Sequence, residues 1–462
     1  MKVFMLGWEF PPHISGGLGT ACHGLTRGLD EIGVSVCFVL PKAVGAGEAA
    51  HVQLRSPADL VGQRLDALPS ERIESTEFER VELHRVDAVL QPYADPASFE
   101  QAVRKLVQMQ ELLPAEEAEG ASPAPPERPA EARASADDAP GAPQGSFVAG
   151  AGAHYRGDLM GQVHRYARLA LELARHETFD VIHAHDWMTY PAGLAVAAAS
   201  HKPLVVHVHS TEFDRSGMNV NQQVYEIERT GMHGADRVVC VSHLTENLVV
   251  SRYGVPPDKC LVVYNAVELP DAGKWQMQPI RQTDRIVLFL GRVTMQKGPE
   301  YFLRAAKKVV EVYQDVRFVI AGSGDLITQC IQQVADLALG RYVTFTGFLR
   351  GDDVARVFRM ADLYVMPSVS EPFGIAPLEA LSHNVPVLIS KQSGVSEVLT
   401  HVLKVDFWDV DEMANKILAV LRHAPLRRAL RQHGHIELRK LSWRDSAQKL
   451  KTVYEQLVAA GT

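Results

Sequence analysis

The sequence has few cysteines, no long apolar run and no excess of positive charge. Its five cysteines are scattered over 462 residues, with no CxxC pair and no metal-ligand spacing, which predicts a reducing compartment. No apolar run approaches the roughly 20 residues of a transmembrane helix. The opening run in MKVFMLGWEFPP is too short for a signal sequence. We therefore expect a cytoplasmic protein without a transmembrane segment.

Charge and composition narrow the class further. The formal net charge is −8 and the isoelectric point is about 6.2. General nucleic-acid binding is not expected, because it needs a basic surface. A hydrophobic fraction of 46% is typical of a globular protein with a sizeable core, and the length allows two or three domains. The sequence does not determine the oligomeric state.

Strand-like and helix-like stretches alternate along most of the chain, which predicts an α/β protein. KVFMLG and VSVCFVLP read as strands on either side of a helix that begins in a glycine-rich turn. A second series begins with RIVLFLG. Two series of this kind predict two Rossmann-like domains that face each other across a cleft. We expect the first domain at residues 1–268, a linker at 269–283 and the second domain at 284–440.

Residues 114–148 interrupt the first domain with a stretch rich in Pro, Ala, Glu, Gly and Ser. Such a composition buries too little apolar surface to offset the entropy lost on ordering. We interpret the stretch as a disordered insertion within the first domain and not as a domain boundary. A regulatory or tethering role and an inert insertion both remain open.

The stretch SEPFGIAPLE, residues 370–379, carries two carboxylates eight residues apart, Glu371 and Glu379. The preceding ADLYVMPS reads as a buried strand, and Gly374 permits a tight turn before a helix near Ile375. Free N–H groups at Ile375 and Ala376 favour an anion such as phosphate. Carboxylates are repelled by phosphate, so the two glutamates are expected to bind neutral hydroxyls. A sugar nucleotide offers both groups.

Two further turns have groups for phosphate. In GRVTMQKG, Arg292 and Lys297 stand on one strand–helix turn, where a guanidinium and an ammonium group can hold a diphosphate. Near the N-terminus, Gly16 and Gly17 lie in a glycine-rich loop that lets a phosphate approach the backbone and a helix N-terminus. A solvated basic loop is the alternative for the first of these turns.

Polar side chains also collect at the ends of two strands of the first domain. FDVIHAHDWM and KPLVVHVHSTEF end in several histidines and carboxylates. Histidines two apart on a strand share a face, which is one arrangement that can bind a metal. No HExxH motif occurs, and we expect no metal.

These segments together resemble retaining glycosyltransferases with the GT-B fold, the glycogen synthase-like group. The resemblance rests on PSVSEPFG, GRVTMQKG, the GGL loop, HDW and HSTE, and it covers nearly the whole chain outside residues 114–148. It implies transfer of a hexose, in the first place glucose from ADP-glucose or UDP-glucose, to a glucan or oligosaccharide. It also implies no metal and no cofactor, and a last helix within 441–462 that crosses back onto the first domain.

The resemblance assigns a role to each matching residue. Those expected to act in catalysis are His209, Arg292, Lys297 and Glu371. Those expected to bind the donor are Gly16, Gly17, Gly347, Phe348, Gly374, Ile375, Ala376 and Glu379. Those expected in the acceptor cleft are His185, Asp186, Trp187 and Glu212. His209 would orient the donor sugar and Glu379 would hold the ribose. The acceptor would attack from the face that the diphosphate leaves.

The chain departs from the family pattern at three positions. Ile14 stands where the family usually has the lysine that precedes the glycine pair, Ser210 where many synthases have asparagine, and Ala266 where the family has glycine. Three other functions also remain: the same transfer to a lipid or cell-envelope oligosaccharide, a sugar-nucleotide epimerase, and a non-catalytic protein that binds a sugar nucleotide or glucan. An epimerase would give product without an acceptor, and a binding protein would bind without turnover.

Overall fold

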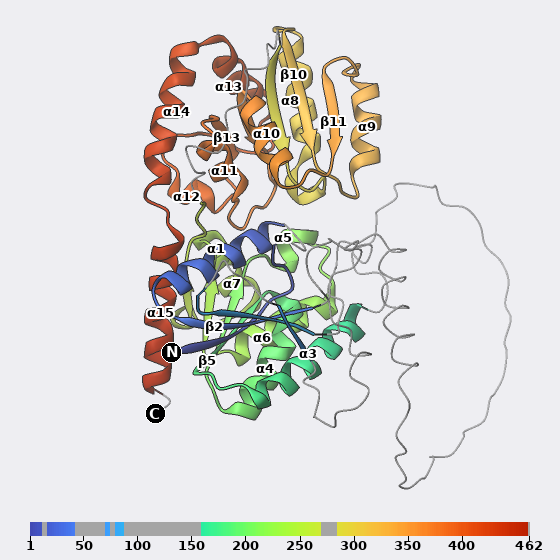
Figure 1. The fold of residues 1–462 in the computed structure, drawn as a ribbon. Coiled ribbons are helices and arrows are strands. Elements are labelled where there is room, and N and C mark those ends of the chain that lie inside the picture. The colour runs from blue at the N-terminus through green and yellow to red at the C-terminus, as the bar shows by residue number, and fades with distance from the viewer. Residues whose placement is uncertain (12–15, 42–69, 74–78, 87–158, 269–283, 461–462) are drawn as a thin grey trace, which may run out of the picture.

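The protein folds into two α/β domains, each built around a largely parallel sheet (Figure 1). The computed structural model describes residues 1–11, 16–41, 70–73, 79–86, 159–268 and 284–460. The prediction of two Rossmann-like domains is confirmed. The insertion expected at 114–148, the linker expected at 269–283 and Ile14 lie outside the described residues.

Within the described residues, the sheet of the first domain has eight strands in the order β3-β4-β2-β1-β5-β6-β7-β8. Neighbouring strands are parallel, except that β3 runs antiparallel to β4. The strands are β1 (Lys2–Leu6), β2 (Ser35–Pro41), β3 (Ser70–Ile73), β4 (Val81–Val86), β5 (Val181–His185), β6 (Leu204–Val208), β7 (Arg237–Cys240) and β8 (Cys260–Val262). The helices are α1 (Gly17–Glu31), α3 (Leu159–His176), α4 (Tyr190–Ser200), α5 (Glu212–Ser216), α6 (Gln222–Gly234) and α7 (His243–Tyr253), with the short helices η2 (Trp187–Thr189) and η3 (Pro257–Lys259).

The second sheet is wholly parallel, with the order β11-β10-β9-β12-β13-β14. Its strands are β9 (Arg285–Leu290), β10 (Val316–Ala321), β11 (Val343–Gly347), β12 (Leu363–Met366), β13 (Val387–Ser390) and β14 (Leu403–Val405). Its helices are η4 (Met295–Lys297), α8 (Pro299–Val310), α9 (Ile327–Asp336), α10 (Asp352–Met360), α11 (Ala376–Ser382), α12 (Val395–Val398), α13 (Val410–Arg422) and α14 (Ala424–Leu438), and α15 (Trp443–Ala460) follows.

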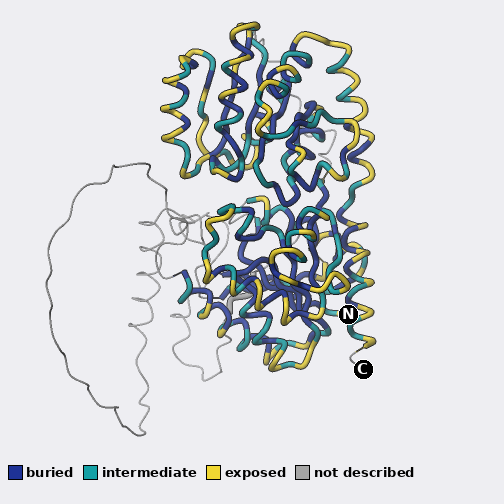
Figure 2. Tube along the Cα trace, turned by 180° about the vertical axis from the view of Figure 1, so that it is seen from behind, coloured by how far each residue is buried: buried dark blue, intermediate teal, exposed yellow. Residues whose placement is uncertain are grey.

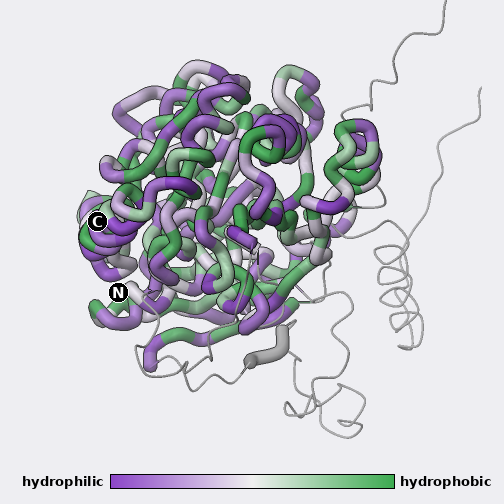
Figure 3. The backbone as a smooth tube through the Cα atoms, turned by 90° about the horizontal axis from the view of Figure 1, so that it is seen from above, coloured by the Kyte–Doolittle hydropathy of each residue, from purple (hydrophilic) through white to green (hydrophobic). Residues whose placement is uncertain are grey.

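The central strands form because their apolar residues are covered on both faces. Every residue of β5, β6, β12 and β13 is buried, as expected for parallel strands between helical layers. Figure 2 shows the buried strands inside each domain, with exposed residues along the outer helices. Figure 3 shows that hydrophilic and hydrophobic residues both occur along the helices around the sheets. None of the described helices combines the length and apolarity that a membrane crossing requires.

The last helix, α15, lies beside the first domain and packs against α1 (Figure 1). Two glycines of α1 make the close approach possible. A Cβ atom on Gly24 would lie 2.2 Å from the Trp443 ring, and one on Gly28 would lie 2.5 Å from the Trp443 carbonyl oxygen. Helix α15 is therefore packed into the core of the first domain.

Candidate active site

The turn between β12 and α11 carries the two carboxylates of the SEPFG stretch. Gly374 has φ +100°, a conformation that residues with a side chain rarely adopt, and α11 begins at Ala376. The backbone of Glu371 is bonded on both sides to the turn after β13: its N–H donates to Gln392 O at 3.0 Å, and its carbonyl accepts from Gly394 N at 2.9 Å. The turn is therefore a fixed support for Glu371.

Glu371 and Lys297 form an ion pair. Lys297 Nζ lies 2.6 Å from Glu371 Oε2, and Ser368 Oγ donates to the same oxygen at 3.1 Å. The Glu371 side chain is 8% exposed and that of Lys297 is 22% exposed. The structure thus joins a predicted phosphate ligand to a predicted sugar ligand. An ammonium group has three donors, so Lys297 can hold Glu371 and a phosphate together.

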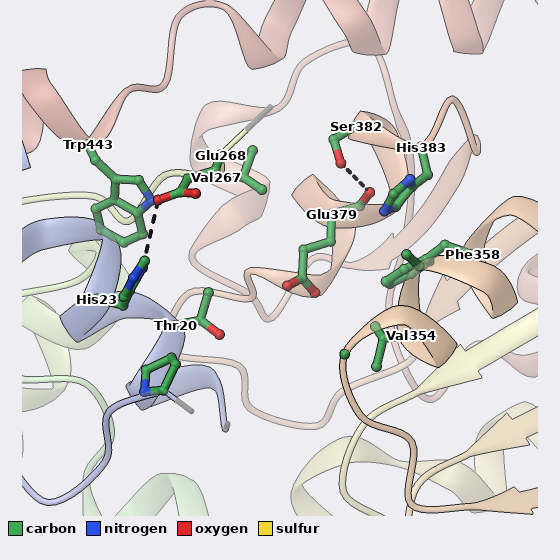
Figure 4. Close-up of a pocket in the computed structure, with 13 residues that line it drawn as sticks. Thr20, His23, Val267, Glu268, Val354, Phe358, Glu379, Ser382, His383 and Trp443 are labelled. Atoms are coloured by element: carbon green, nitrogen blue, oxygen red, sulfur yellow. Dashed lines mark hydrogen bonds and ion pairs between the residues drawn. The ribbon is translucent and has the colours of Figure 1, made fainter. Parts of the chain in front are cut away.

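Glu379 lies on α11 and lines a cavity of about 280 Å³ between the domains, here called the interdomain pocket. The walls come from α1, residues 267–268, α10, α11 and Trp443. Figure 4 shows the Glu379 carboxylate pointing into the pocket, with Thr20 and His23 of α1 on the far side. Burial raises the pKa of Glu379 to about 7. Within the described part of the chain, no hydrogen bond or ion pair reaches this carboxylate, which suits a ligand that brings its own hydroxyl donors.

The N-terminus of α1 already holds a carboxyl side chain, that of Glu9. Glu9 Oε2 accepts from Gly19 N at 3.0 Å, and a Cβ atom on Gly16 would lie only 2.5 Å from the same oxygen. Burial raises the pKa of Glu9, while the N–H groups of α1 and the charge of Arg292 oppose the rise. Gly17 is exposed, with open space beside it. Of the two predicted glycines, Gly16 therefore accommodates Glu9, and Gly17 is the one open to a ligand.

The remaining donor-side residues lie on turns of the second domain. Arg292 follows the end of β9 and donates to Gln296 Oε1 at 3.5 Å. Gly347 ends β11 with φ +72°, and the adjoining Phe348 side chain is 55% exposed. An exposed aromatic ring and an open turn are compatible with the predicted contact to a nucleobase.

The two domains meet on either side of Glu371. Ser370 Oγ donates to Asp214 Oδ1 of the first domain at 2.5 Å, and Ser242 Oγ donates to the Pro372 carbonyl at 2.5 Å. The carboxyl ends of the strands of the two sheets therefore face each other at this turn, and Glu371 lies where the two domains meet.

A second contact between the domains comes from α12. The Glu397 carboxylate accepts from His243 N at 3.0 Å and Leu244 N at 2.8 Å, at the N-terminus of α7. A carboxylate in the first turn of a helix is favoured by the helix dipole. This contact is a further link between the second domain and the first.

Four histidines lie on one face of the first sheet at the ends of β5 and β6. His185 is opposite His207 in the register, and His185 Nδ1 lies 2.9 Å from His209 Nε2. Burial lowers the pKa of His209 and of His183 to about 3, so both rings are neutral near pH 7. His183 bonds to the Tyr454 hydroxyl of α15.

The carboxylate of Asp186 supports His209 by accepting a hydrogen bond from the His209 backbone. Asp186 has φ 59°, and its Oδ1 accepts from His209 N at 2.8 Å and from Ser210 N at 3.3 Å. Burial raises its pKa to about 7, although Arg215 and these backbone donors oppose the rise. Asp186 therefore fixes the loop that carries His209.

The four residues predicted for the acceptor cleft are buried, and their contact with an acceptor stays a prediction. His185 is 0% exposed, Asp186 is 6% exposed and Trp187, in the hydrophobic core, is 3% exposed. Glu212 is 1% exposed, because its carboxylate pairs with Arg215 at 3.2 Å. Arg215 also pairs with buried Glu228 at 2.5 Å. These side chains build the wall beside His209, and the carboxylates of Asp186 and Glu212 accept hydrogen bonds within the protein.

The histidine cluster supplies two groups of potential metal ligands. Cys22 lies with His185 and His209, and His183 lies with His185 and His207, with the ligand atoms of each group within 4.8 Å of one another. The rings of His183 and His185 are stacked, with centroids 4.4 Å apart, which disfavours a metal shared by both rings in the second group. The rings of His185 and His209 in the first group are tilted by 35°. Reaction without a metal stays a prediction.

Sequence reasoning missed Glu9, Ser368 and Asp214. Glu9 precedes the glycine loop and Ser368 precedes the SEPFG stretch, so proximity to those motifs was the available signal. Asp214 had none, because its partner Ser370 is 156 residues away.

Comparisons with known proteins give the family. Three family models match: the starch synthase catalytic domain at residues 2–111, glycosyltransferase family 4 at 123–270 and glycosyl transferases group 1 at 274–436. An uncharacterized glycosyltransferase of Methanocaldococcus jannaschii is 31% identical over 297 residues, which are 60% of this chain and 76% of that protein.

Two other relatives have assigned activities. An Escherichia coli UDP-Gal:alpha-D-GlcNAc-diphosphoundecaprenol alpha-1,3-galactosyltransferase is 26% identical, over 54% of this chain and 68% of that protein. A glycogen synthase of Mycobacterium tuberculosis is 27% identical, over 48% of this chain and 54% of that protein.

Solved structures share the fold. Sucrose-phosphate synthase from Thermosynechococcus elongatus superimposes with a TM-score of 0.65 at 16% identity, over 99% of each chain. Anabaena HepE in complex with UDP-glucose gives 0.63 at 16% identity, over 99% of this chain and 100% of that chain. The chain is a glycosyltransferase with the GT-B fold, and it belongs to the glycogen and starch synthase-like group.

Proposed function

We propose that the chain transfers a hexose, in the first place glucose, from a nucleoside diphosphate sugar to a glucan, with retention of anomeric configuration and without a metal. The observation that carries the proposal is the Lys297–Glu371 pair, at 2.6 Å, on the turn where the two domains meet. One partner of this pair suits a diphosphate and the other suits a sugar.

The donor diphosphate would lie against Arg292 and Lys297. Breaking the bond between sugar and phosphate leaves negative charge on the diphosphate, and two fixed cations stabilise that charge as it develops. In other transferases a divalent metal ion stabilises this charge. Because Glu371 already positions Lys297, little reorganisation is needed when the charge appears.

The transferred sugar would lie beside Glu371 and His209. Positive charge develops near the anomeric carbon, and a buried carboxylate stabilises it at short range. Asp186 is 6% exposed and its Oδ1 accepts from two backbone N–H groups, which disfavours it as a nucleophile for the opposite face. These observations support attack from the face that the diphosphate leaves, with the leaving phosphate accepting the proton of the acceptor hydroxyl.

The donor nucleoside would occupy the interdomain pocket. Glu379 would accept hydrogen bonds from the ribose hydroxyls, and the turn at Gly347 and Phe348 would meet the base. The pocket carries no feature that separates ADP-glucose from UDP-glucose. The HepE complex with UDP-glucose supports a uridine donor by similarity of fold.

A lipid-linked acceptor is the second candidate. Met218 is 75% exposed just after α5, Met295 is 37% exposed in η4, and these two elements pack against each other. Exposed methionines beside Lys297 give the rim an apolar character that suits an amphipathic acceptor. The Escherichia coli relative, named for a diphosphoundecaprenol-linked acceptor, supports the same idea.

The test is a screen of donors against acceptors, with and without chelator, and with anomer-resolved analysis of the product. We expect an α-linked product from ADP-glucose or UDP-glucose on a malto-oligosaccharide, unchanged by EDTA. Product on a diphosphoundecaprenol-linked sugar alone would establish the second candidate. A β-linked product, a requirement for added magnesium, or conversion of the donor without an acceptor would overturn the proposed reaction.

A further inference from the structure

A group of aromatic rings in the second domain lies outside the site described above. Trp408 is 59% exposed in the turn between β14 and α13. Among the described tryptophan and phenylalanine residues, the other exposed one is Phe348, whose ring is proposed to meet the base. A single exposed ring is common on protein surfaces, whereas exposed rings that adjoin one another mark a binding surface.

Trp408 adjoins two further rings. It meets Phe407 at a centroid distance of 4.8 Å and an interplanar angle of 84°, and Phe407 meets Tyr301 of α8 at 5.1 Å and 72°. Phe407 and Tyr301 are both partly exposed. Tyr301 lies against Gly298, where an added Cβ atom would be 3.1 Å from Tyr301 Cδ2. Gly298 follows Lys297, so these three rings, here called the aromatic strip, begin beside the Lys297 turn.

The turn that carries Trp408 is held by hydrogen bonds on both sides. Asp406 Oδ1 accepts from Gln392 Nε2 at 3.0 Å, and the Asp406 carbonyl accepts from Asp409 N at 2.9 Å. Asp409 Oδ1 accepts from Glu412 N at 3.0 Å and so caps α13. A fixed backbone therefore presents the exposed indole, and a ligand has little ordering of the turn to offset.

The aromatic strip lies on the side of the second sheet away from the proposed nucleoside site. Helix α11, which lines the interdomain pocket, packs on one face of the sheet through Leu378. Helix α8 packs through Phe302 on the other face, and Tyr301 adjoins that layer. Alternate residues of β9 divide between the two layers, as expected for opposite faces of a strand. With the nucleoside in the pocket and the diphosphate at Lys297, the side of α8 is left for an acceptor.

We propose that the aromatic strip binds the outer glucosyl units of a glucan acceptor, and that Trp408 gives the enzyme a preference for long acceptors over short ones. Glucosyl rings have apolar C–H faces that stack on aromatic rings, and hydroxyl groups around their edges. Exposed groups of both signs flank the strip: the Arg304 guanidinium lies 5.6 Å from the Tyr301 ring centre, and Asp409 follows Trp408. This mixture suits a neutral polyhydroxyl chain better than an anionic one. The choice of a glucan rests on the proposed function.

Binding is tested without transfer, by electrophoresis in native gels with and without glycogen. We expect glycogen to retard the wild-type protein. Trp408→Ala should weaken the apparent affinity by about 2- to 10-fold, the range for loss of one aromatic stacking contact. Trp408→Phe should lose less, because it keeps a ring. Ile331→Ala is the matched control and should bind as wild type, since Ile331 is 53% exposed on α9, outside the strip.

Three results would overturn the proposal. They are a wild-type protein that glycogen does not retard, a Trp408→Ala variant retarded as strongly as wild type, and an equal loss in Ile331→Ala. Light scattering of the same samples tests a second copy of this chain as the occupant. A wild-type dimer that becomes monomeric in Trp408→Ala, with glycogen binding unchanged, would assign the strip to a dimer interface. Because Trp408 is exposed, all variants should melt close to wild type.

The preference for long acceptors is tested by kinetics on glycogen and on maltotriose. Trp408→Ala should raise KM for glycogen by about the factor found in the gels, while KM for maltotriose and kcat on both acceptors stay unchanged. An equal rise in KM on both acceptors would overturn the preference for length. The two failures are distinguishable: transfer to malto-oligosaccharides without retardation removes the strip alone. Retardation that depends on Trp408, without any transfer, removes the proposed reaction and leaves the strip as a glucan site.

Discussion

The two domains use the polar residues at their strand ends in opposite ways. In the first domain, Asp186 and Glu212 are buried and their carboxylates accept hydrogen bonds within the chain, while the neighbouring histidine rings are enclosed and several of their nitrogens have no partner among the described residues. In the second domain, Lys297 and Glu379 border the cleft, and Glu379 has no bonded partner among the described residues. The first domain supplies a rigid and mostly neutral wall, and the second supplies charge. A donor with a charged diphosphate and a neutral sugar matches this division.

The largest loss of activity is expected when the cations of the second domain are removed. Arg292→Ala and Lys297→Ala should each lower kcat by about 100- to 1,000-fold, the usual cost of losing a preorganised donor to a developing anion. Both residues lie on a partly exposed turn, so the protein should remain folded. Steady-state kinetics and thermal melting on the same samples measure the two effects.

Lys391→Ala is the control for this prediction. Lys391 is also a lysine on a strand–helix turn of the second domain, paired with Asp406 at 2.7 Å, but its side chain is 54% exposed. Its removal should change neither kcat nor melting temperature appreciably. Wild-type activity in Arg292→Ala or Lys297→Ala would contradict the assignment of diphosphate binding to this turn.

The second prediction separates the two carboxylates. Glu371→Gln should lower kcat with a smaller change in donor KM, because its charge acts chiefly in the transition state. Glu379→Gln should raise donor KM more than it lowers kcat, because contacts with the ribose are alike in the ground and transition states. Kinetics at saturating acceptor measure both. Equal effects, or the reverse pattern, would mean that the two roles are wrongly assigned.

The third prediction concerns stability and pH at Glu379. Folding raises its pKa from the ordinary 4.5 to about 7, so the folded chain holds this proton more tightly than the unfolded chain. The resulting stability is fully present below about pH 4.5 and is lost as the pH rises through 7. Glutamine does not titrate. Glu379→Gln should therefore melt close to wild type at pH 5 and above wild type at pH 8. A gap that is the same at both pH values would show that the carboxylate is well solvated.

The smallest effect is expected in the first domain, from deletion of residues 114–148. The segment lacks a core-forming pattern, and long surface insertions carry a small closure cost. Melting temperature and activity on short acceptors should stay nearly unchanged. A large fall in melting temperature on deletion would show that the segment packs against the domain.

The fold and the charged turns were predictable because they depend on local patterns. Buried parallel strands are continuous apolar runs. The glycines and charged residues that are typical of strand–turn–helix junctions occur in GRVTMQKG and in SEPFGIAPLE. The side chains of the residues predicted for the acceptor cleft are buried, and their part in acceptor binding stays a prediction. A motif such as HDW gives the end of a strand, but the direction of each side chain depends on what covers it.

The sequence alone determined the α/β class, the two-domain order and the group of residues around Glu371, because each follows from periodicity or from residues close along the chain. The tertiary structure decided which of these groups are free for a ligand. It paired Lys297 with Glu371, 74 residues apart, placed Glu9 at the N-terminus of α1 and enclosed His185 behind His209. Those outcomes depend on burial and on partners distant in sequence, because the solvation and protonation of a polar group are set by its neighbours in space.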